Sequence, residues 1–143
     1  MNTFVSVISS PLFLAPFLAW IIVQTIKSAI YTVKHHKFNF RVLLRTGGMP
    51  SSHSGGTVAL ATAVGRTEGW TSPLFIVTLV FTFIIMNDAA GVRRAAGQQA
   101  RVLNKIIEDG RLDYERVKEF IGHTPVEVIV GAVLGVIVGI LLT

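Results

Sequence analysis

Four apolar stretches separated by polar segments constrain this chain more than any other feature of its sequence. They cover Leu12–Val33, Ser54–Gly65, Pro73–Met86 and Val126–Leu142. A helix needs about 20 apolar residues to cross a bilayer. The second stretch is short and rich in Gly, Ala and Thr, which favours a place inside a helix bundle and leaves a re-entrant path open. The pattern predicts an all-α fold, a polytopic membrane bundle with about four transmembrane helices and an additional cytoplasmic helical segment.

Composition supports this fold class and excludes several functions. The mean hydropathy is +0.61, and only 15% of the residues are charged, which is too apolar for an ordinary soluble domain. Residues 1–143 fit one membrane-embedded domain. Cysteine is absent, which rules out thiolate metal sites and cysteine nucleophiles. The net charge is +5, but no run of basic and aromatic residues suggests a nucleic-acid partner.

The basic residues predict how the chain is oriented in the membrane. Eleven of the 13 Lys and Arg residues fall in two polar segments, 34–53 and 87–123. With four spans these segments lie on the same side, and the positive-inside rule makes that side cytoplasmic. Both termini are then expected outside a plasma membrane of bacterial type. No basic region precedes the first apolar stretch, so that stretch is expected to remain as a membrane helix.

The second polar segment is expected to be helical. Residues Ala89–Glu108 are rich in Ala, Arg and Gln with apolar residues at helical spacing, and Gly110 is placed to end that helix. Asp113 then begins an amphipathic stretch that runs to Ile121, which predicts a second helix near the membrane surface.

Two histidines occupy matching positions in the sequence. His53 begins the second apolar stretch and His123 precedes the fourth, so both are expected at the cytoplasmic interface. A helix N-terminus offers unpaired N–H groups and a partial positive charge to an anion. A neutral histidine can attack phosphorus, and a protonated one can supply a proton to the leaving group. The pattern indicates phosphate chemistry.

Further polar residues near these histidines are candidates for substrate binding. Ser51, Ser52 and neighbouring glycines would let the backbone approach a phosphate. Several arginines could neutralise its charge; they are Arg41, Arg45, Arg93 and Arg94. Asp88 ends an apolar span and needs a partner, for which Arg93 or Arg94 is nearest. Structural readings also exist, because Arg93 and Arg94 fit as interfacial anchors and Thr124 with Glu127 fits a capping box. His35 and His36 have no third ligand nearby, so a metal site is not expected.

Three sequence elements resemble a known family. PSSHS at 50–54 and HTPVEVIVGAVLG at 123–135 resemble two signature motifs of the type 2 phosphatidic acid phosphatase superfamily. With NDAAGVRRAAGQQARVLN at 87–104, they resemble its divergent branch described as acid phosphatase/vanadium-dependent haloperoxidase-related. The resemblance covers nearly the whole chain.

The resemblance implies a role for particular residues. His123 would be the nucleophile, Glu127 the acid that orients it, and His53 the general acid, while Ser51 and Ser52 would contact phosphate. Lys34 and Arg41 have the spacing of the superfamily's first motif. The chain departs from the superfamily where an arginine is expected six residues before His123, because Val117 stands there. Nothing in this resemblance requires a metal or another cofactor.

The leading hypothesis is a membrane phosphatase acting on a lipid phosphate through a phosphohistidine. A cytoplasmic site favours a substrate made in the inner leaflet, such as phosphatidylglycerophosphate or phosphatidate. The alternative, motivated by the missing arginine, is a catalytically silent membrane protein that binds anionic lipid headgroups or a partner. A small transporter subunit is a third reading. Four short spans bury little surface, which leaves room for a homodimer, although no motif specifies one.

Overall fold

The fold consists of helices throughout the part of the chain that is described. The computed structural model describes residues 2–37, 39–44 and 47–143, and no strand occurs among them. The elements, in chain order, are α1 (Thr3–Ile8), α2 (Pro11–His35), the 3₁₀ helix η1 (Phe40–Leu44), α3 (Ser52–Glu68), α4 (Pro73–Ala90), α5 (Val92–Asp109) and α6 (Pro125–Leu142). The all-α prediction is confirmed.

Three of the long helices begin with the same local signal. Ser10, Ser72 and Thr124 each occupy the N-cap, and each is followed by a proline at the first helical position. In each case the side-chain oxygen accepts a hydrogen bond from a backbone N–H two or three residues further along. A proline has no N–H to leave unpaired there, and its fixed φ suits the helix. Ser72 and Pro73 thus mark the start of α4 directly before the third apolar stretch.

Three helical rods are long and apolar enough to cross a membrane. They are α2, the rod formed by α4 and α5 (Pro73–Asp109), and α6. Many of their large side chains point outward, including Phe17, Phe83 and Ile129, which are 50%, 68% and 60% exposed. An apolar surface this extensive is costly in water but suits hydrocarbon. The chain is therefore an integral membrane protein.

The remaining long helix, α3, lies among the others. It has 17 residues, which corresponds to about 26 Å of helix, and it makes its most extensive contact with α6. Three glycines spaced four residues apart form a stripe along α6 that lets the two helices approach closely; they are Gly131, Gly135 and Gly139. A Cβ atom on Gly135 would lie 2.6 Å from the carbonyl oxygen of Gly55, and one on Gly139 would lie 2.6 Å from Cβ of Thr62. The stripe therefore serves close helix packing.

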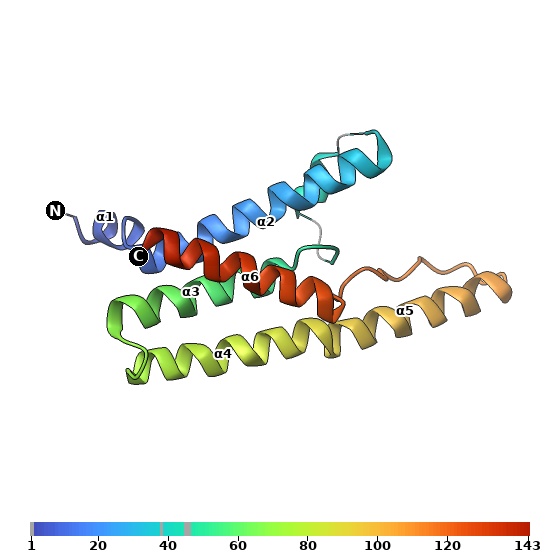
Figure 1. Ribbon diagram of the computed structural model, residues 1–143. Coiled ribbons are helices and arrows are strands. Elements are labelled where there is room, and N and C mark those ends of the chain that lie inside the picture. Colours follow the sequence, from blue (N-terminus) through green and yellow to red (C-terminus); the bar gives the residue numbers. More distant parts are fainter. Residues whose placement is uncertain (1, 38, 45–46) are drawn as a thin grey trace.

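The four helices of the bundle alternate in direction (Figure 1). Helices α2 and α4 run away from the chain termini, whereas α3 and α6 run back toward them. Both termini therefore lie at one end of the bundle, and the first residues of α3 and α6 lie at the other. This arrangement brings the sequence around His53 and the sequence around His123 to the same end.

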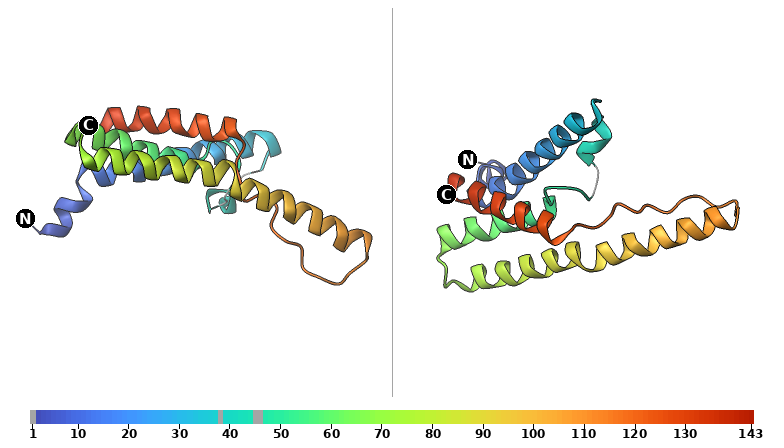
Figure 2. Two further views of the ribbon diagram at one scale, coloured as in Figure 1. Left: turned by 90° about the horizontal axis from the view of Figure 1, so that it is seen from below. Right: turned by 45° about the vertical axis from the view of Figure 1, so that its right-hand side comes forward.

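Helix α5 and the segment after it form an arm that extends beyond the bundle. Figure 1 and both views of Figure 2 show α5 continuing from α4 past the ends of the other helices, with residues 112–124 returning alongside it. The predicted helical segment is confirmed, although Gly91 divides it from α4. As predicted, Gly110 follows the last helical residue.

The second helix predicted from Asp113 to Ile121 is wrong, because residues 112–124 are not helical. The side chain of Asn104 binds both backbone groups of Val117, donating to its carbonyl oxygen at 2.8 Å and accepting from its N–H at 2.8 Å. Those groups are therefore not available for helical hydrogen bonds. Gly97 has no side chain where the carbonyl oxygen of Glu119 packs against α5. Tertiary contacts outweigh the amphipathic pattern here.

Candidate functional site

The N-terminus of α3 is held against the start of α6 by backbone contacts. Ser51 is fully buried and caps α3, accepting a hydrogen bond from the N–H of Ser54. Its own N–H donates to the carbonyl oxygen of Glu127 at 3.0 Å. Gly131 faces the Ser51 backbone so closely that a Cβ atom would overlap it. Two predicted site residues, Ser51 and Glu127, therefore lie in adjoining turns of neighbouring helices.

His123 is anchored through its backbone just before α6 begins. Its N–H donates to the carbonyl oxygen of Ala89 at the end of α4, at 3.0 Å. The preceding Gly122 lies against the backbone of Arg94, where a Cβ atom would not fit. The side chain of His123 is 0% exposed. These contacts fix the position of the imidazole at the junction of α4, α5 and α6.

Glu127 contacts both the His123 ring and the start of its own helix. Its Oε2 lies 3.3 Å from Nδ1 of His123 and accepts a hydrogen bond from the N–H of Thr124 at 2.9 Å. Glu127 therefore closes a capping box and also contacts the imidazole, while its role in orienting His123 for reaction stays a prediction. A carboxylate at Nδ1 favours the tautomer that carries the proton there, leaving the Nε2 lone pair free.

His53 faces His123 across the interface between α3 and α6. The two ring centroids are 5.8 Å apart, and the ring planes meet at 69°. Nε2 of His123 and Nδ1 of His53 are both buried and have no hydrogen-bond partner within the described part of the chain. A buried polar atom without a partner is rare enough to need an explanation. Here two such atoms belong to facing imidazoles.

The charges around His123 favour its neutral form. Burial lowers the pKa of His123 below its usual value of 6.5, and the Lys27 ammonium lowers it further, while Glu127 acts in the opposite direction. Desolvation and a nearby cation both disfavour the imidazolium. At neutral pH the ring is therefore uncharged, with its proton toward Glu127.

The predicted cationic residues are distributed unequally around this pair. Arg93 forms an ion pair with Asp88, which confirms the expected partner of that carboxylate, and both side chains are about four-tenths exposed. Burial lowers the pKa of His53 below its usual value of 6.5; the charge of Arg93 lowers it further, and the charge of Asp88 acts in the opposite direction. Arg94 is exposed, and its backbone rather than its side chain packs beside Gly122.

Other predicted contacts are placed less closely or fall outside the description. Ser52 is the first residue of α3 and is half-buried. Lys34, near the end of α2, lines a cavity next to the site instead of facing the histidines. Arg45 and the side chain of Arg41 lie outside the described residues.

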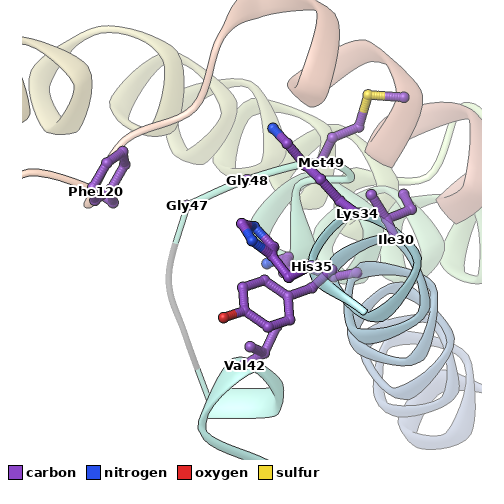
Figure 3. Close-up of a pocket in the computed structure, with 10 residues that line it drawn as sticks. Ile30, Lys34, His35, Val42, Gly47, Gly48, Met49 and Phe120 are labelled. Atoms are coloured by element: carbon purple, nitrogen blue, oxygen red, sulfur yellow. The ribbon is translucent and has the colours of Figure 1, made fainter. Parts of the chain in front are cut away.

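The cavity has a volume of about 490 Å³ and lies between the end of α2 and the loop before α3 (Figure 3). Its wall includes Lys27, Lys34 and Tyr31 on one side, and Gly48 and Phe120 on the other. The backbone of Gly48 also lies against the His123 ring. The cavity is thus separated from the histidine pair by a single loop.

Sequence reasoning missed Lys27 as a site residue. Its side chain is only 5% exposed and lines the cavity. Its charge contributes to lowering the pKa of both His53 and His123. The sequence contained a signal for it, because an ionisable residue within an apolar span is usually functional. Lys27 stands in neither of the two polar segments, so the count of basic residues does not point to it.

Comparison with known proteins shows which family the chain belongs to. The family described as "Divergent PAP2 family" matches residues 8–138. The chain belongs to this divergent PAP2 family. A relative from Bacillus subtilis (strain 168), described as "Uncharacterized membrane protein YuiD", is 37% identical over 144 residues, covering 90% of this chain and 91% of the relative. No solved structure matches the chain significantly. Membership of this family relates the chain as a whole to phosphatase-type proteins.

Proposed function

We propose that this protein is a membrane phosphatase that hydrolyses a lipid phosphate monoester through a phosphohistidine on His123. The observation that carries the proposal is the buried, unpartnered Nε2 of His123, held by Glu127 at the opposite ring nitrogen and facing His53. Orientation of a nucleophile by a third group is the general arrangement for covalent catalysis. The family relationship supports the same class of reaction.

The reaction would proceed in two balanced steps. Nε2 of His123 attacks phosphorus while the bond from phosphorus to the ester oxygen breaks, and His53 in its protonated form gives that oxygen its proton. Burial and the charge of Arg93 lower the pKa of His53, so the negative charge of the bound phosphate has to stabilise this imidazolium in the substrate complex. The alcohol leaves, and phosphate remains bonded to His123. A water molecule then attacks phosphorus and gives its proton to His53. The bond from phosphorus to Nε2 breaks, inorganic phosphate leaves, and both histidines return to their starting states.

The surroundings offer donors for the phosphate oxygens. The first backbone N–H groups of α3, beginning with that of Ser52, have no partners within the helix, and Ser51 precedes them. Lys27 and Arg93 both supply positive charge near His53. Such groups stabilise the charge that spreads over the transferring phosphoryl group. Arg93 would divide its interaction between Asp88 and the substrate.

The proposed substrate follows from the side of the membrane on which the site lies. The polar segments with most of the Lys and Arg residues are at the histidine end, which the positive-inside rule assigns to the cytoplasm. Both termini then lie outside the bacterial plasma membrane. Phosphatidylglycerophosphate or phosphatidate in the inner leaflet would reach such a site directly.

Phosphate release from reconstituted protein tests the proposed reaction. Wild-type protein in vesicles that contain phosphatidylglycerophosphate or phosphatidate should release inorganic phosphate, and His123→Ala should not. His36→Ala is the matched control, because His36 is an exposed histidine outside the site, and it should keep full activity. If wild type and His123→Ala give the same release from both lipids, the proposed function is wrong.

The second candidate function is binding of anionic lipid headgroups without catalysis. Two observations favour it: Nε2 of His123 is not accessible in this conformation, and Val117 stands where the superfamily has an arginine. Headgroup binding would then survive His123→Ala but weaken with Arg93→Ala and Arg94→Ala. Binding of a short-chain, water-soluble form of the anionic lipid to the three variants in neutral detergent separates this function from the first.

A further inference from the structure

The cavity beside the histidine pair has a basic wall that extends beyond the histidines. Its volume of about 490 Å³ lies in the range of about 300–1,000 Å³ that is typical of small-molecule sites. Lys27 and Lys34 supply the cations of this wall, His35 and Tyr31 are its other ionisable side chains, and no carboxylate occurs among its described residues. A concave surface that carries cations and no anion favours an anionic ligand.

The two lysines lie at different positions along the cavity. Both belong to α2 and are seven residues apart, which places them on one face of the helix and about 10 Å apart along its axis. Lys27 is buried, and its charge contributes to lowering the pKa of both histidines, so it lies at the inner end of the cavity. Lys34 is exposed near the end of α2, and no described carboxylate forms an ion pair with it. Lys34 is thus a cation at the rim of the cavity, and the proposed reaction leaves it without a role.

A loop separates the rim of the cavity from the His123 ring. The backbone of Gly48 lies against that ring, and Gly48 with Met49 also lines the cavity, which lies between this loop and α2 (Figure 3). A group bound at Lys34 is therefore not the phosphate that His123 attacks. It is a second anionic group.

The rest of the wall indicates what kind of molecule carries this second group. Ile30, Val42, Met49 and Phe120 line the cavity, so much of its surface is apolar. Inorganic phosphate would leave this surface and most of the volume to water, whereas a phosphate attached to a carbon skeleton would cover it. The wall therefore favours an organic phosphate over a free one.

We propose that the cavity holds the leaving group of the substrate and that Lys34 binds a second phosphate on it. In the phosphatase function proposed above, on which this site depends, the phosphate monoester lies at His123. The preferred substrate is then a lipid in which a short carbon linker joins that monoester to a phosphodiester. Phosphatidylglycerophosphate has both groups, whereas phosphatidate has the monoester alone. The phosphodiester, which leads to the acyl chains, would lie at the exposed rim.

Lipid binding to His123→Ala protein tests this site without turnover of the ligand. Short-chain phosphatidylglycerophosphate and phosphatidate would be titrated into the protein in neutral detergent, and each Kd would be measured by calorimetry. Because Lys34 adds a charge-assisted hydrogen bond to the second phosphate, phosphatidylglycerophosphate should bind about tenfold more tightly than phosphatidate. Adding Lys34→Gln should remove most of this preference. Adding Lys37→Gln is the matched control, because Lys37 is exposed just after α2 but outside the cavity wall, and the preference should remain.

Three results would overturn the proposal. Equal affinities of the His123→Ala protein for the two lipids would show that the second phosphate is not bound. An equal loss of affinity for both lipids on adding Lys34→Gln would show that Lys34 does not select between them. Inorganic phosphate that binds as tightly as phosphatidylglycerophosphate, and no longer binds after Lys34→Gln, would assign the cavity to a free anion.

Phosphate release by protein with an intact His123 separates failure of this site from failure of the proposed function. A Lys34-dependent preference in protein that hydrolyses neither lipid would support the cavity site and contradict the phosphatase function. Hydrolysis of both lipids without any difference in their affinities would support the phosphatase function and overturn the cavity site.

Discussion

Glu127 serves the fold and the proposed chemistry with the same oxygen atom. Its Oε2 accepts the N–H of Thr124 and contacts Nδ1 of His123. Replacing Glu127 with Gln retains the shape and a cap acceptor but removes the charge that stabilises an imidazole carrying its proton at Nδ1. We expect Glu127→Gln to lower kcat by about 100-fold or more, as for other carboxylates that orient a catalytic histidine. A variant with wild-type kcat in the phosphate-release assay would show that Glu127 is only a capping residue.

The positive charge of Lys27, in the first span, affects the pKa of the proposed nucleophile His123. Its ammonium contributes to lowering the pKa of His123, so removing it raises that pKa. The neutral, nucleophilic form of His123 then begins to be lost at a higher pH as the solution is acidified. In Lys27→Met, the acid limb of the kcat/KM profile should shift toward higher pH while kcat/KM also falls. Lys37→Met, an exposed control, should keep the wild-type profile; an unshifted profile in Lys27→Met would contradict the assigned role.

The contact between α3 and α6 positions both histidines, and glycine makes that contact close. A Cβ atom at Gly135 would lie 2.6 Å from a backbone oxygen of α3, and backbone cannot move aside as a flexible side chain can. Overpacking of this kind costs about 1–3 kcal/mol. We expect Gly135→Val to lower the unfolding midpoint in detergent and to reduce activity, because the helices separate. Val133→Ala, on the outward face of α6 and 54% exposed in the wild type, should change neither; equal stability of the two variants would contradict this packing.

The helices themselves could be predicted well from the sequence, since their signals are local. The Ser-Pro and Thr-Pro starts, the apolar runs and the glycine stripe each act within a few turns. The segment Asp113–Ile121 could not be predicted in the same way. Its amphipathic pattern favours a helix, but its conformation depends on Asn104, a residue far enough away along α5 that only the folded arm brings the two together.

The whole molecule shows which parts of the site depended on topology. Pairing of His53 with His123 followed from the alternating helix directions, which the number of spans predicts. The cavity beside the pair did not follow, because it forms between the end of α2 and a loop before α3 whose path depends on contacts with Phe120 and Gly122. The same packing places Lys27 in the wall of this cavity.

Orientation in the membrane is a property of the whole chain and can be measured directly. Lys37 lies between α2 and α3, and Thr71 lies in the turn between α3 and α4; both are exposed. Because native cysteine is absent, single-cysteine variants at these positions report one side each. An impermeant maleimide should label Thr71→Cys in intact cells and Lys37→Cys only after permeabilisation. The reverse pattern, or labelling of both from outside, would contradict the cytoplasmic site.

The most direct test of the central claim is to trap the phosphoryl group on His123. In His53→Ala, hydrolysis of the intermediate should slow because no base activates water, so phosphoenzyme should accumulate with an activated phosphate ester whose leaving group needs no acid. Rapid mixing, alkaline quenching and peptide mass spectrometry would locate the group. The account predicts an acid-labile, alkali-stable phosphoryl group on the peptide that contains His123, and none in His123→Ala. Phosphoryl transfer to another residue, or turnover without any phosphoenzyme, would contradict it.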